Sequence, residues 1–299
     1  MKLIMFTDPT GVTHPGVVRD DQAVVIDGVS SIRELFDRGE AGMEAACHAS
    51  GQAFALSEVR LRAPIIPRKL IHTSGNFREH EEESKNVAWS HEIAPWIIFF
   101  QNVDAIIGPD DAIVYPEHLT KELDHELELA VVMAKSGGNL SVDEAKSYIG
   151  GFLIFNDITA RDIQRREMRS GVFSFCKSIE TFCPLGPWVV TPDEVGDPHT
   201  LDMQLRVNGE LRQKSHSSRM AVTLPELIAH HSPIHYSAGD VLTTGTVSGV
   251  AGFKSDAKQW YLKPGDIVEC EIERVGIMRN PVISWEEAHG APAPSFREW

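Results

Sequence analysis

The stretch Glu126-Leu-Glu-Leu-Ala-Val-Val-Met133 sets two glutamates in an apolar run that predicts a β-strand. Side chains of a strand alternate between its two faces, so Glu126 and Glu128 project from the same face, which continues with Ala130 and Val132. Two like charges on a half-buried face are unfavourable unless a positive charge lies between them. A divalent cation with oxygen ligands meets that need.

A third carboxylate, Asp157, ends a second apolar run, Gly151-Phe-Leu-Ile-Phe-Asn-Asp157. If the two runs are neighbouring strands, Glu126, Glu128 and Asp157 form a three-carboxylate metal site. The alternative is that the glutamates face solvent on an edge strand while Asp157 caps a helix, because charged side chains are usually solvated. The spacing alone leaves both interpretations open.

The composition indicates a soluble globular protein. Of the 299 residues, 42% are hydrophobic and 24% are charged, which is typical of a soluble chain with a sizeable core. We expect no membrane span and no signal peptide, because every apolar stretch is too short. The net charge of −15 argues against nucleic-acid binding, which needs a basic surface. The four cysteines are scattered without a CxxC pair, which suits a reducing cytoplasm.

Residues 1–63 predict a small N-terminal α+β domain. Residues 18–26 have the alternation of a hairpin that turns at Asp20-Asp21-Gln22. The segment Ser31-Ile-Arg-Glu34 is a capping box that opens a helix ending near Gly39. Pro64 and Pro67 then interrupt regular structure, so we place a boundary there and assign residues 64–299 to a second domain.

Strand patterns dominate residues 64–299, which predicts an α+β fold that is mostly β. Two further capping boxes, Ser141-Val-Asp-Glu144 and Thr223-Leu-Pro-Glu226, open helices, and we expect the first helix to end at Gly150-Gly151. The segment Val207-Asn-Gly-Glu-Leu211 is a hairpin signal.

His80 and Glu83 lie three residues apart in an acidic segment that predicts a helix. On one helix face, Glu83 could orient His80 so that the imidazole takes a proton from water. The alternative is a solvated acidic helix whose histidine has no role. The chain has no dinucleotide-binding GxGxxG opening a helix, no Walker loop and no GxSxG elbow, which argues against those chemistries.

Three further polar residues follow Asp157. Gln164 could address the same ligand as Asp157, while Arg161 and Asp162 predict an internal ion pair that braces the turn. Lys177 lies in an apolar setting, where a lysine needs an anionic partner. That partner is either a metal-binding carboxylate or a substrate carboxylate, and the sequence does not decide between them.

Taken together, these segments resemble the fumarylacetoacetate hydrolase family over about residues 64 to 284. The matching motifs occur in the family's order, and each is modest alone. They are Gly75-Asn-Phe-Arg-Glu-His80 with Glu83, Asp124-His-Glu-Leu-Glu-Leu-Ala-Val-Val132, Asn156-Asp-Ile-Thr-Ala-Arg-Asp162, Lys177-Ser-Ile-Glu-Thr-Phe-Cys-Pro-Leu-Gly-Pro187, Val207-Asn-Gly-Glu-Leu-Arg-Gln213, Gly239-Asp-Val-Leu-Thr-Thr-Gly-Thr246, and Leu262-Lys-Pro-Gly-Asp-Ile-Val268 with Arg279-Asn-Pro281.

The resemblance implies a mixed β-sandwich or β-roll, usually a homodimer, that carries Mg²⁺ or Mn²⁺, and sometimes Ca²⁺, on a carboxylate triad. It assigns metal binding to Glu126, Glu128 and Asp157, and a general-base pair on a lid to His80 and Glu83. It also assigns contacts with the substrate or its oxyanion to the positions Gln164, Lys177, Gly245 and Thr246.

Two positions depart from many relatives, which carry tyrosine at Phe77 and lysine at Gln101. We expect Gln101 to contact the substrate. Because glutamine is neutral, this position has one positive charge fewer than in the relatives that carry lysine. Trp89 and Trp96 either line a pocket for an apolar tail or pack in the core.

The leading hypothesis is a metal-dependent hydrolase of aromatic-compound catabolism. It would cleave a carbon–carbon bond in a 1,3-diketo acid such as an acylpyruvate or fumarylpyruvate, with a metal-bound enolate as leaving group. His80, oriented by Glu83, would activate the water, and Lys177 and Gln164 would hold the carboxylate and enolate. The alternatives are a decarboxylase of oxaloacetate type, an enol–keto isomerase or hydratase with the same site, and a non-catalytic binder of 2-oxo acids.

Overall fold

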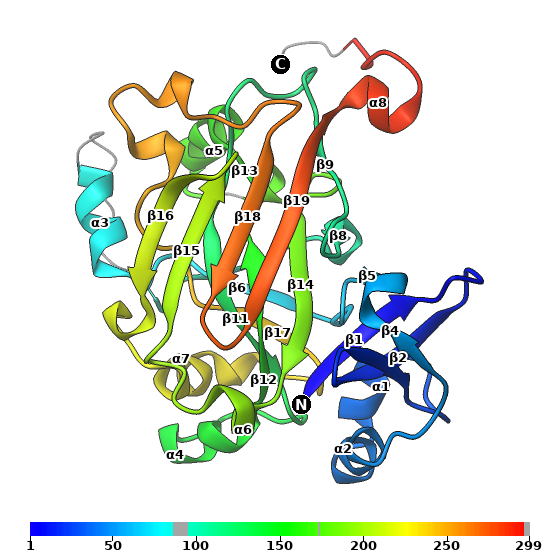
Figure 1. The fold of residues 1–299 in the computed structure, drawn as a ribbon. Helices are drawn as coiled ribbons and strands as arrows, with labels where there is room; N and C mark the ends of the chain where they lie inside the picture. Colours follow the sequence, from blue (N-terminus) through cyan, green and yellow to red (C-terminus); the bar gives the residue numbers. More distant parts are fainter. Residues whose placement is uncertain (86–94, 173, 296–299) are drawn as a thin grey trace.

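Two β-sheets form most of the protein, which confirms the predicted α+β class with mainly β structure (Figure 1). The structure is a computed structural model that describes residues 1–85, 95–172 and 174–295. Across these residues no helix has the length and apolar character needed to cross a lipid bilayer.

The elements alternate short strands with short helices along the chain. The strands are β1 (Lys2–Thr7), β2 (Thr13–Arg19), β3 (Gln22–Val25), β4 (Ala53–Ala55), β5 (Arg60–Arg62), β6 (Leu70–Thr73), β7 (Ile98–Phe100), β8 (Ile106–Ile107), β9 (Ile113–Tyr115), β10 (Leu123–Asp124), β11 (Leu127–Met133), β12 (Ile149–Asn156), β13 (Thr159–Ala160), β14 (Cys183–Val190), β15 (Asp202–Val207), β16 (Glu210–His216), β17 (Val241–Thr243), β18 (Ile267–Ile272) and β19 (Gly276–Ser284). The α-helices are α1 (Ile32–Asp37), α2 (Glu40–Cys47), α3 (Arg78–Ser84), α4 (Val142–Ala145), α5 (Arg161–Glu167), α6 (Pro192–Val195), α7 (Leu224–His231) and α8 (Trp285–His289).

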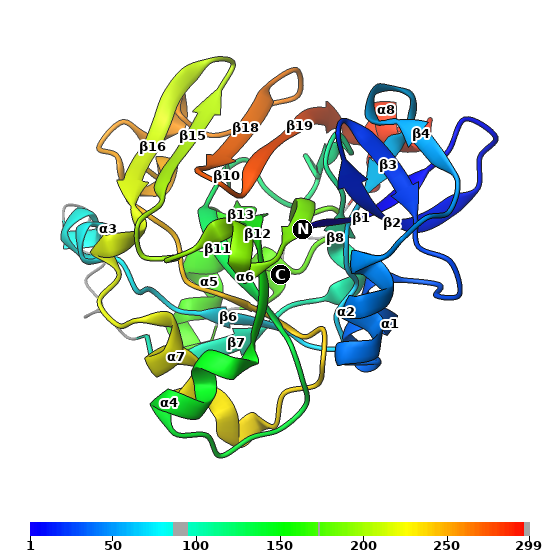
Figure 2. The ribbon, with the colours of Figure 1, turned by 60° about the horizontal axis from the view of Figure 1, so that its bottom comes forward.

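The larger sheet runs β4-β3-β2-β1-β14-β12-β11-β17-β6-β7, with β5 also paired to β1 and β8 to β14. The smaller sheet runs β16-β15-β18-β19-β9 and lies over the larger one (Figures 1 and 2). A continuous apolar core fills the space between them, with Leu129 of β11, Leu205 of β15 and Val268 of β18 among its fully buried members. The arrangement is the predicted β-sandwich or roll.

Strand β11 lies inside the larger sheet, between β12 and β17. Its residues are buried on both faces: Val131 belongs to the core shared with the smaller sheet, whereas Ala130 and Val132 belong to a second core beneath. The predicted alternation is therefore confirmed, and the edge-strand alternative for Glu126 and Glu128 is wrong. The register pairs Leu127 with Asn156, which brings the start of β11 beside the end of β12.

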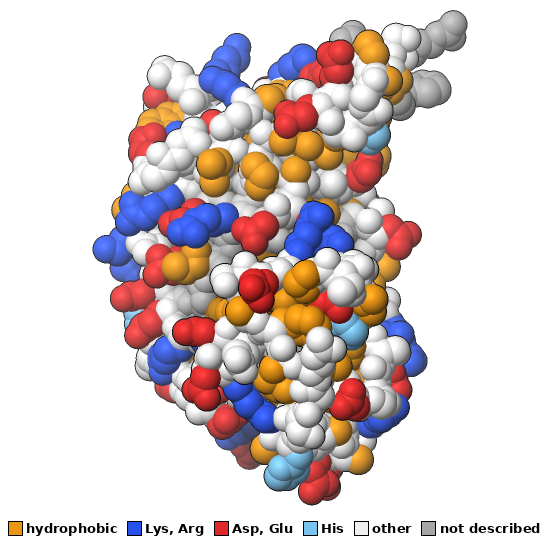
Figure 3. Space-filling view, turned by 45° about the vertical axis from the view of Figure 1, so that its right-hand side comes forward, with side chains coloured by type: hydrophobic (Ala, Val, Ile, Leu, Met, Phe, Trp, Pro, Cys, Tyr) orange, Lys and Arg blue, Asp and Glu red, His pale blue; other side chains and the backbone are white. Residues whose placement is uncertain are grey.

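The N-terminal segment forms the predicted hairpin and helix. Asp20 and Asp21 turn between β2 and β3 with φ angles of 45° and 61°, and the Ser31 side chain accepts from the Glu34 N–H at the start of α1. Strand β1 also pairs with β14, so hydrogen bonds of the larger sheet join residues on both sides of position 64. The division into two domains at that position stays a prediction. On the face beside this segment, acidic, basic and apolar side chains are interspersed (Figure 3).

The later capping and hairpin predictions are confirmed by complete capping boxes at Ser141 and Thr223 and by the β15–β16 turn at Asn208, whose φ is 53°. The expected helix end at Gly150-Gly151 is wrong, because both glycines lie inside β12. They are required there by close packing: a Cβ at Gly151 would stand 2.4 Å from Val189 Cγ1 on β14. Glycine here indicates close packing between neighbouring strands rather than the end of a helix.

We expect Gly151→Ala to lower the free energy of unfolding by about 1–3 kcal/mol, because the added methyl group overpacks the contact with β14. Urea denaturation monitored by circular dichroism measures the change. A variant within about 0.5 kcal/mol of the parent protein would contradict the packing argument.

Candidate metal centre and active site

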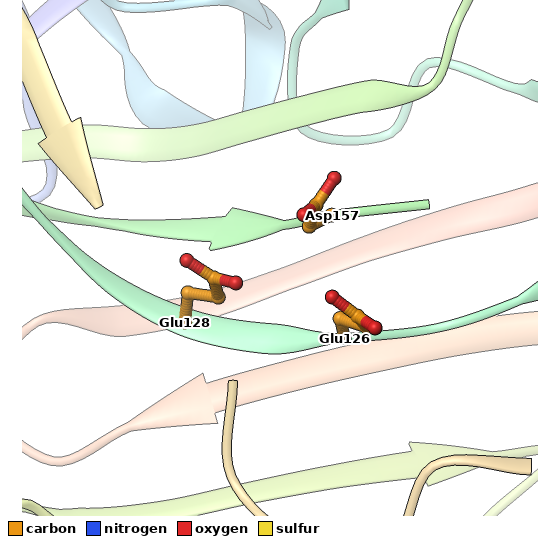
Figure 4. Close-up of side chains that lie close together, drawn as sticks. All are labelled: Glu126, Glu128 and Asp157. Carbon is orange, nitrogen blue, oxygen red and sulfur yellow. The ribbon is translucent and has the colours of Figure 1, made fainter. Parts of the chain in front are cut away.

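Three carboxylates meet where β11 begins and β12 ends, as predicted (Figure 4). One oxygen from each of Glu126, Glu128 and Asp157 lies within 4.8 Å of the others. The three residues are only 5%, 2% and 1% exposed, respectively. Three buried carboxylates this close require compensating positive charge.

Two buried cations supply part of that charge. Lys177 Nζ donates to Glu126 Oε2 at 2.8 Å, to Asp157 Oδ2 at 2.5 Å and to Thr159 Oγ1 at 2.8 Å. The sequence left open whether Lys177 pairs with a metal-binding carboxylate or with a substrate carboxylate. In the protein without substrate, it pairs with Glu126 and Asp157.

Arg161 is the second cation. The prediction that it forms an ion pair with Asp162 is wrong. Its guanidinium pairs with Asp124 at 2.8 Å and lies 2.6 Å from Glu126, while it is only 2% exposed. Asp162 instead accepts from the hydroxyl of Thr120. The side chain of Arg161 runs back to β10 because Asp124, at the end of that strand, is fully buried and already accepts backbone N–H groups from residues 251 and 252.

The pKa values of the three carboxyls diverge because the cations reach them unequally. Burial raises the pKa of Glu126, but Lys177 and Arg161 outweigh it and hold the value at about 2. Burial and the neighbouring charges of Asp157 and Glu126 raise the pKa of Glu128 well above its usual range. Burial also raises the pKa of Asp157 to about 6, although Lys177 opposes that shift.

The donor set fits a divalent cation. If the carboxyls of Asp124, Glu126, Glu128 and Asp157 are all ionised, as metal binding requires, the two cationic side chains Lys177 and Arg161 leave two negative charges among the described groups. Without a metal ion, the raised pKa of Glu128 favours its protonated form, which reduces that excess. A divalent ion would balance that excess, and clustered carboxylate oxygens are the ligands that Mg²⁺, Mn²⁺ and Ca²⁺ take.

Neighbouring groups hold the carboxylates in place. The backbone N–H of Gly245 donates to Glu128 Oε2 at 3.1 Å, with a φ of 81° that a residue with a side chain rarely adopts. Gln101 Nε2 donates to Asp157 Oδ1 at 2.6 Å. Both were expected at the substrate, and in the structure both contact the proposed metal ligands.

A pocket with a cavity volume of about 70 Å³, open to solvent, leads to the carboxylates. Gln164, Thr246, Lys177 and His80 line it, as does Arg161, which sequence reasoning had placed only in a local ion pair. Its apolar lining residues are Phe77, Phe99, Met168 and Phe253. A polar end and an apolar wall suit a small organic acid.

The pair of His80 and Glu83 lies on α3 at the side of this pocket. His80 Nδ1 is 3.7 Å from Glu83 Oε2, which is an ionic contact too long for a hydrogen bond. The Glu83 carboxylate accepts from the backbone N–H of Gly249, and the His80 ring stacks on Phe253 with centroids 4.9 Å apart. The solvated-helix alternative is therefore wrong for these two side chains.

The structure describes Trp96 but not Trp89. Trp96 is 56% exposed and lines a separate surface hollow with Leu227 and His230, so core packing is wrong for it. Trp89 lies outside the described residues.

A mostly β fold that brings three buried carboxylates and a histidine, with a glutamate beside it, to one pocket defines a candidate metal-dependent enzyme. Residues 69–283 match the family model described as "Fumarylacetoacetate (FAA) hydrolase C-terminal". The chain belongs to this family, and the resemblance noted in the sequence is confirmed.

Relatives and solved structures agree with this membership. The chain is 37% identical over 255 residues to the mitochondrial oxaloacetate tautomerase Fahd2a of Rattus norvegicus, covering 84% of this chain and 79% of the relative. It resembles the fumarylacetoacetate hydrolase of Exiguobacterium antarcticum with a TM-score of 0.80 and 30% identity, covering 95% and 99% of the two chains. It also resembles a maleylpyruvate hydrolase of Sphingobium sp. SYK-6, crystallised with manganese(II) and pyruvate, with a TM-score of 0.74, 28% identity and coverage of 95% and 99%.

We expect Glu128→Gln to weaken Mn²⁺ binding by more than about a hundredfold, since it removes a charged ligand, while the metal-free protein stays folded. The fold should survive because the substitution removes a repelled charge. Isothermal titration calorimetry measures the affinity. Glu122→Gln is the matched control, because Glu122 pairs with Arg165 near the surface. Full-affinity binding by Glu128→Gln would contradict the ligand assignment.

Stabilisation by Mn²⁺ should grow as the pH rises. The pKa of Asp157 is raised from 3.8 to about 6, so its protonated form stabilises the metal-free fold below 3.8, and that stability is lost as the pH rises through about 6. Metal ions need the ionised carboxylate, so protons compete at low pH. Thermal unfolding with Mn²⁺ and with chelator, at about pH 5 and about pH 8, measures this difference. An equal or larger shift at about pH 5 would contradict the site.

Proposed function

We propose that the protein is a divalent-metal-dependent enzyme that hydrolyses a carbon–carbon bond in a 1,3-diketo acid of the acylpyruvate type. The convergence of Glu126, Glu128 and Asp157 beside a pocket that also holds His80 carries the proposal. Mg²⁺ or Mn²⁺ as cofactor, a cytoplasmic location, a homodimeric assembly and a place in aromatic-compound catabolism are parts of the same proposal.

Glu126, Glu128 and Asp157 would hold the metal ion. When bound, such an ion supplies a Lewis acid that polarises a 2-oxo acid and offsets the charge of its enolate. The ammonium of Lys177 and the guanidinium of Arg161 both line the pocket beside these ligands. Their positive charge would attract the substrate carboxylate to this end of the pocket, although each cation already pairs with protein carboxylates.

His80 would act as the general base. Its Nδ1 faces Glu83, which leaves Nε2 to accept a proton from water in the pocket. The resulting hydroxide attacks the distal carbonyl carbon, and the bond from that carbon to the neighbouring methylene breaks. The electron pair passes to the pyruvate part as an enolate, which takes up a proton. The contact of 3.7 Å between Nδ1 and Glu83 would shorten as His80 gains positive charge.

The second candidate is keto–enol tautomerisation of oxaloacetate, which is favoured by the name of the rat relative. This reaction needs the same enolate but no attack by water. Proton transfer by His80 at the carbon next to the 2-oxo group would suffice. Decarboxylation of oxaloacetate would likewise need no activated water.

A substrate panel separates these reactions. Protein loaded with Mn²⁺ is incubated with acetylpyruvate, longer acylpyruvates, fumarylpyruvate and oxaloacetate, and the products are identified by NMR with and without chelator. Hydrolysis yields pyruvate and a carboxylic acid in equal amounts, and we expect this result. Accelerated exchange between the enol and keto signals of oxaloacetate, without hydrolysis of any diketo acid, would overturn the proposal in favour of the tautomerase.

His80→Ala should retain Mn²⁺ binding and lose hydrolysis by about a hundredfold to ten-thousandfold, which is the usual contribution of a general base. Calorimetry and steady-state kinetics measure the two effects separately. His230→Ala is the matched control, because that histidine lies in the hollow beside Trp96 rather than in the main pocket. A His80→Ala variant that hydrolyses at the parent rate would remove His80 as the base, whereas loss of hydrolysis with oxaloacetate decarboxylation intact would favour decarboxylation.

A further inference from the structure

The helix that carries His80 and Glu83 is fastened to the smaller sheet by a third acidic residue, Glu79. Its Oε2 pairs with an Arg219 guanidinium nitrogen at 2.9 Å, and its Oε1 accepts from the hydroxyl of Ser215 on β16. The Glu79 side chain is only 13% exposed. Figures 1 and 2 both place α3 alongside β16. This contact is not part of the chemistry proposed above.

Helix α3 cannot fix its own position. It has 7 residues, which is too short for a stable isolated helix. It also carries Glu79 and Glu83 four residues apart, on the same side, where like charges repel. Each of these carboxylates is held by groups outside the helix: Glu83 accepts a hydrogen bond from the backbone N–H of Gly249, and Glu79 accepts one from Ser215 and forms an ion pair with Arg219. The position of α3 therefore depends on tertiary contacts.

The two anchors hold α3 from different directions. Glu83 and the His80 ring contact the loop that contains Gly249 and Phe253. Glu79 contacts β16 and the 3-10 turn η7 (Ser217–Arg219) that follows it. Asn76 and Phe77, directly before the helix, are also held, by Val222 and Met220, so loss of the Glu79 anchor would loosen α3 rather than free it. His80, the next residue along the chain from Glu79, would then be held less firmly relative to the carboxylate cluster.

We propose that Glu79 is a positioning residue that sets the location of His80 through its pairing with Arg219 and Ser215. Only the expected effect on kcat rests on the proposed function; the anchoring of α3 by Glu79 does not. A base displaced by about 1 Å loses much of its rate advantage, while the metal ligands on β11 and β12 are untouched.

A double-mutant cycle tests the pairing in the full-length, Mn²⁺-loaded protein. Glu79→Ala should lower kcat by about three- to tenfold, with KM and Mn²⁺ affinity within about twofold of the parent values, because a partly exposed ion pair contributes modestly. The acylpyruvate hydrolysed fastest in the substrate panel serves as substrate. Arg219→Ala should lower kcat in the same way, and the double variant should be no worse than Glu79→Ala alone. Losses that multiply in the double variant would overturn the proposal, as would a parent-like kcat for Glu79→Ala.

Glu82→Ala is the matched control, since it removes the same charge from an exposed position on the same helix. It should leave kcat unchanged, and a loss equal to that of Glu79→Ala would mean that helix charge, rather than the anchor, matters.

A second readout does not depend on turnover. Amide hydrogen exchange across residues 78–84, measured without substrate, should speed up in Glu79→Ala and Arg219→Ala but not in Glu82→Ala. If the parent protein hydrolyses no diketo acid, the proposed function fails while this measurement still tests the anchor. Unchanged exchange in Glu79→Ala would overturn the anchor whatever the reaction.

Discussion

An excess of buried negative charge at one point in the larger sheet governs the site. Burial alone would keep Glu126, Glu128 and Asp157 protonated, yet Lys177 and Arg161 hold Glu126 ionised while Glu128 remains strongly shifted. The two cations are thus too few for the carboxylates they face. In the metal-free protein the raised pKa of Glu128 relieves this imbalance by favouring protonation, and in the working protein a bound divalent ion would relieve it instead.

The fold supplies the geometry for this imbalance. Strands β11 and β12 are buried on both faces, so their ends meet in a dry environment where Coulomb interactions are strong. Later in the chain, the backbone N–H of Gly245 reaches Glu128, and α3, which precedes both strands, brings His80 to the same pocket. The three carboxylates lie at the ends of paired strands, whereas the histidine comes from a short helix held by side-chain contacts.

Periodicity was enough to place Glu126 and Glu128 on one face, because side chains two residues apart on a strand share a face whatever the fold. The approach of Asp157, and the choice of a metal site over solvent-exposed glutamates, needed the family motifs. The family motifs led to the His80–Glu83 pair and Lys177. The sequence did not reveal that Arg161 pairs with Asp124, because these residues are 37 apart and meet only through tertiary structure. Gly150 and Gly151 misled for a related reason: close strand packing and helix termination leave the same residue in the sequence. Gln101, expected at the substrate, contacts Asp157 instead, which only side-chain coordinates could reveal.

The most direct test of the central claim is a crystal grown with Mn²⁺ and measured at the manganese absorption edge. The account predicts one strong anomalous peak in contact with carboxylate oxygens of Glu126, Glu128 and Asp157. A well-ordered map with no peak among these three side chains, or with the metal bound elsewhere, would contradict it.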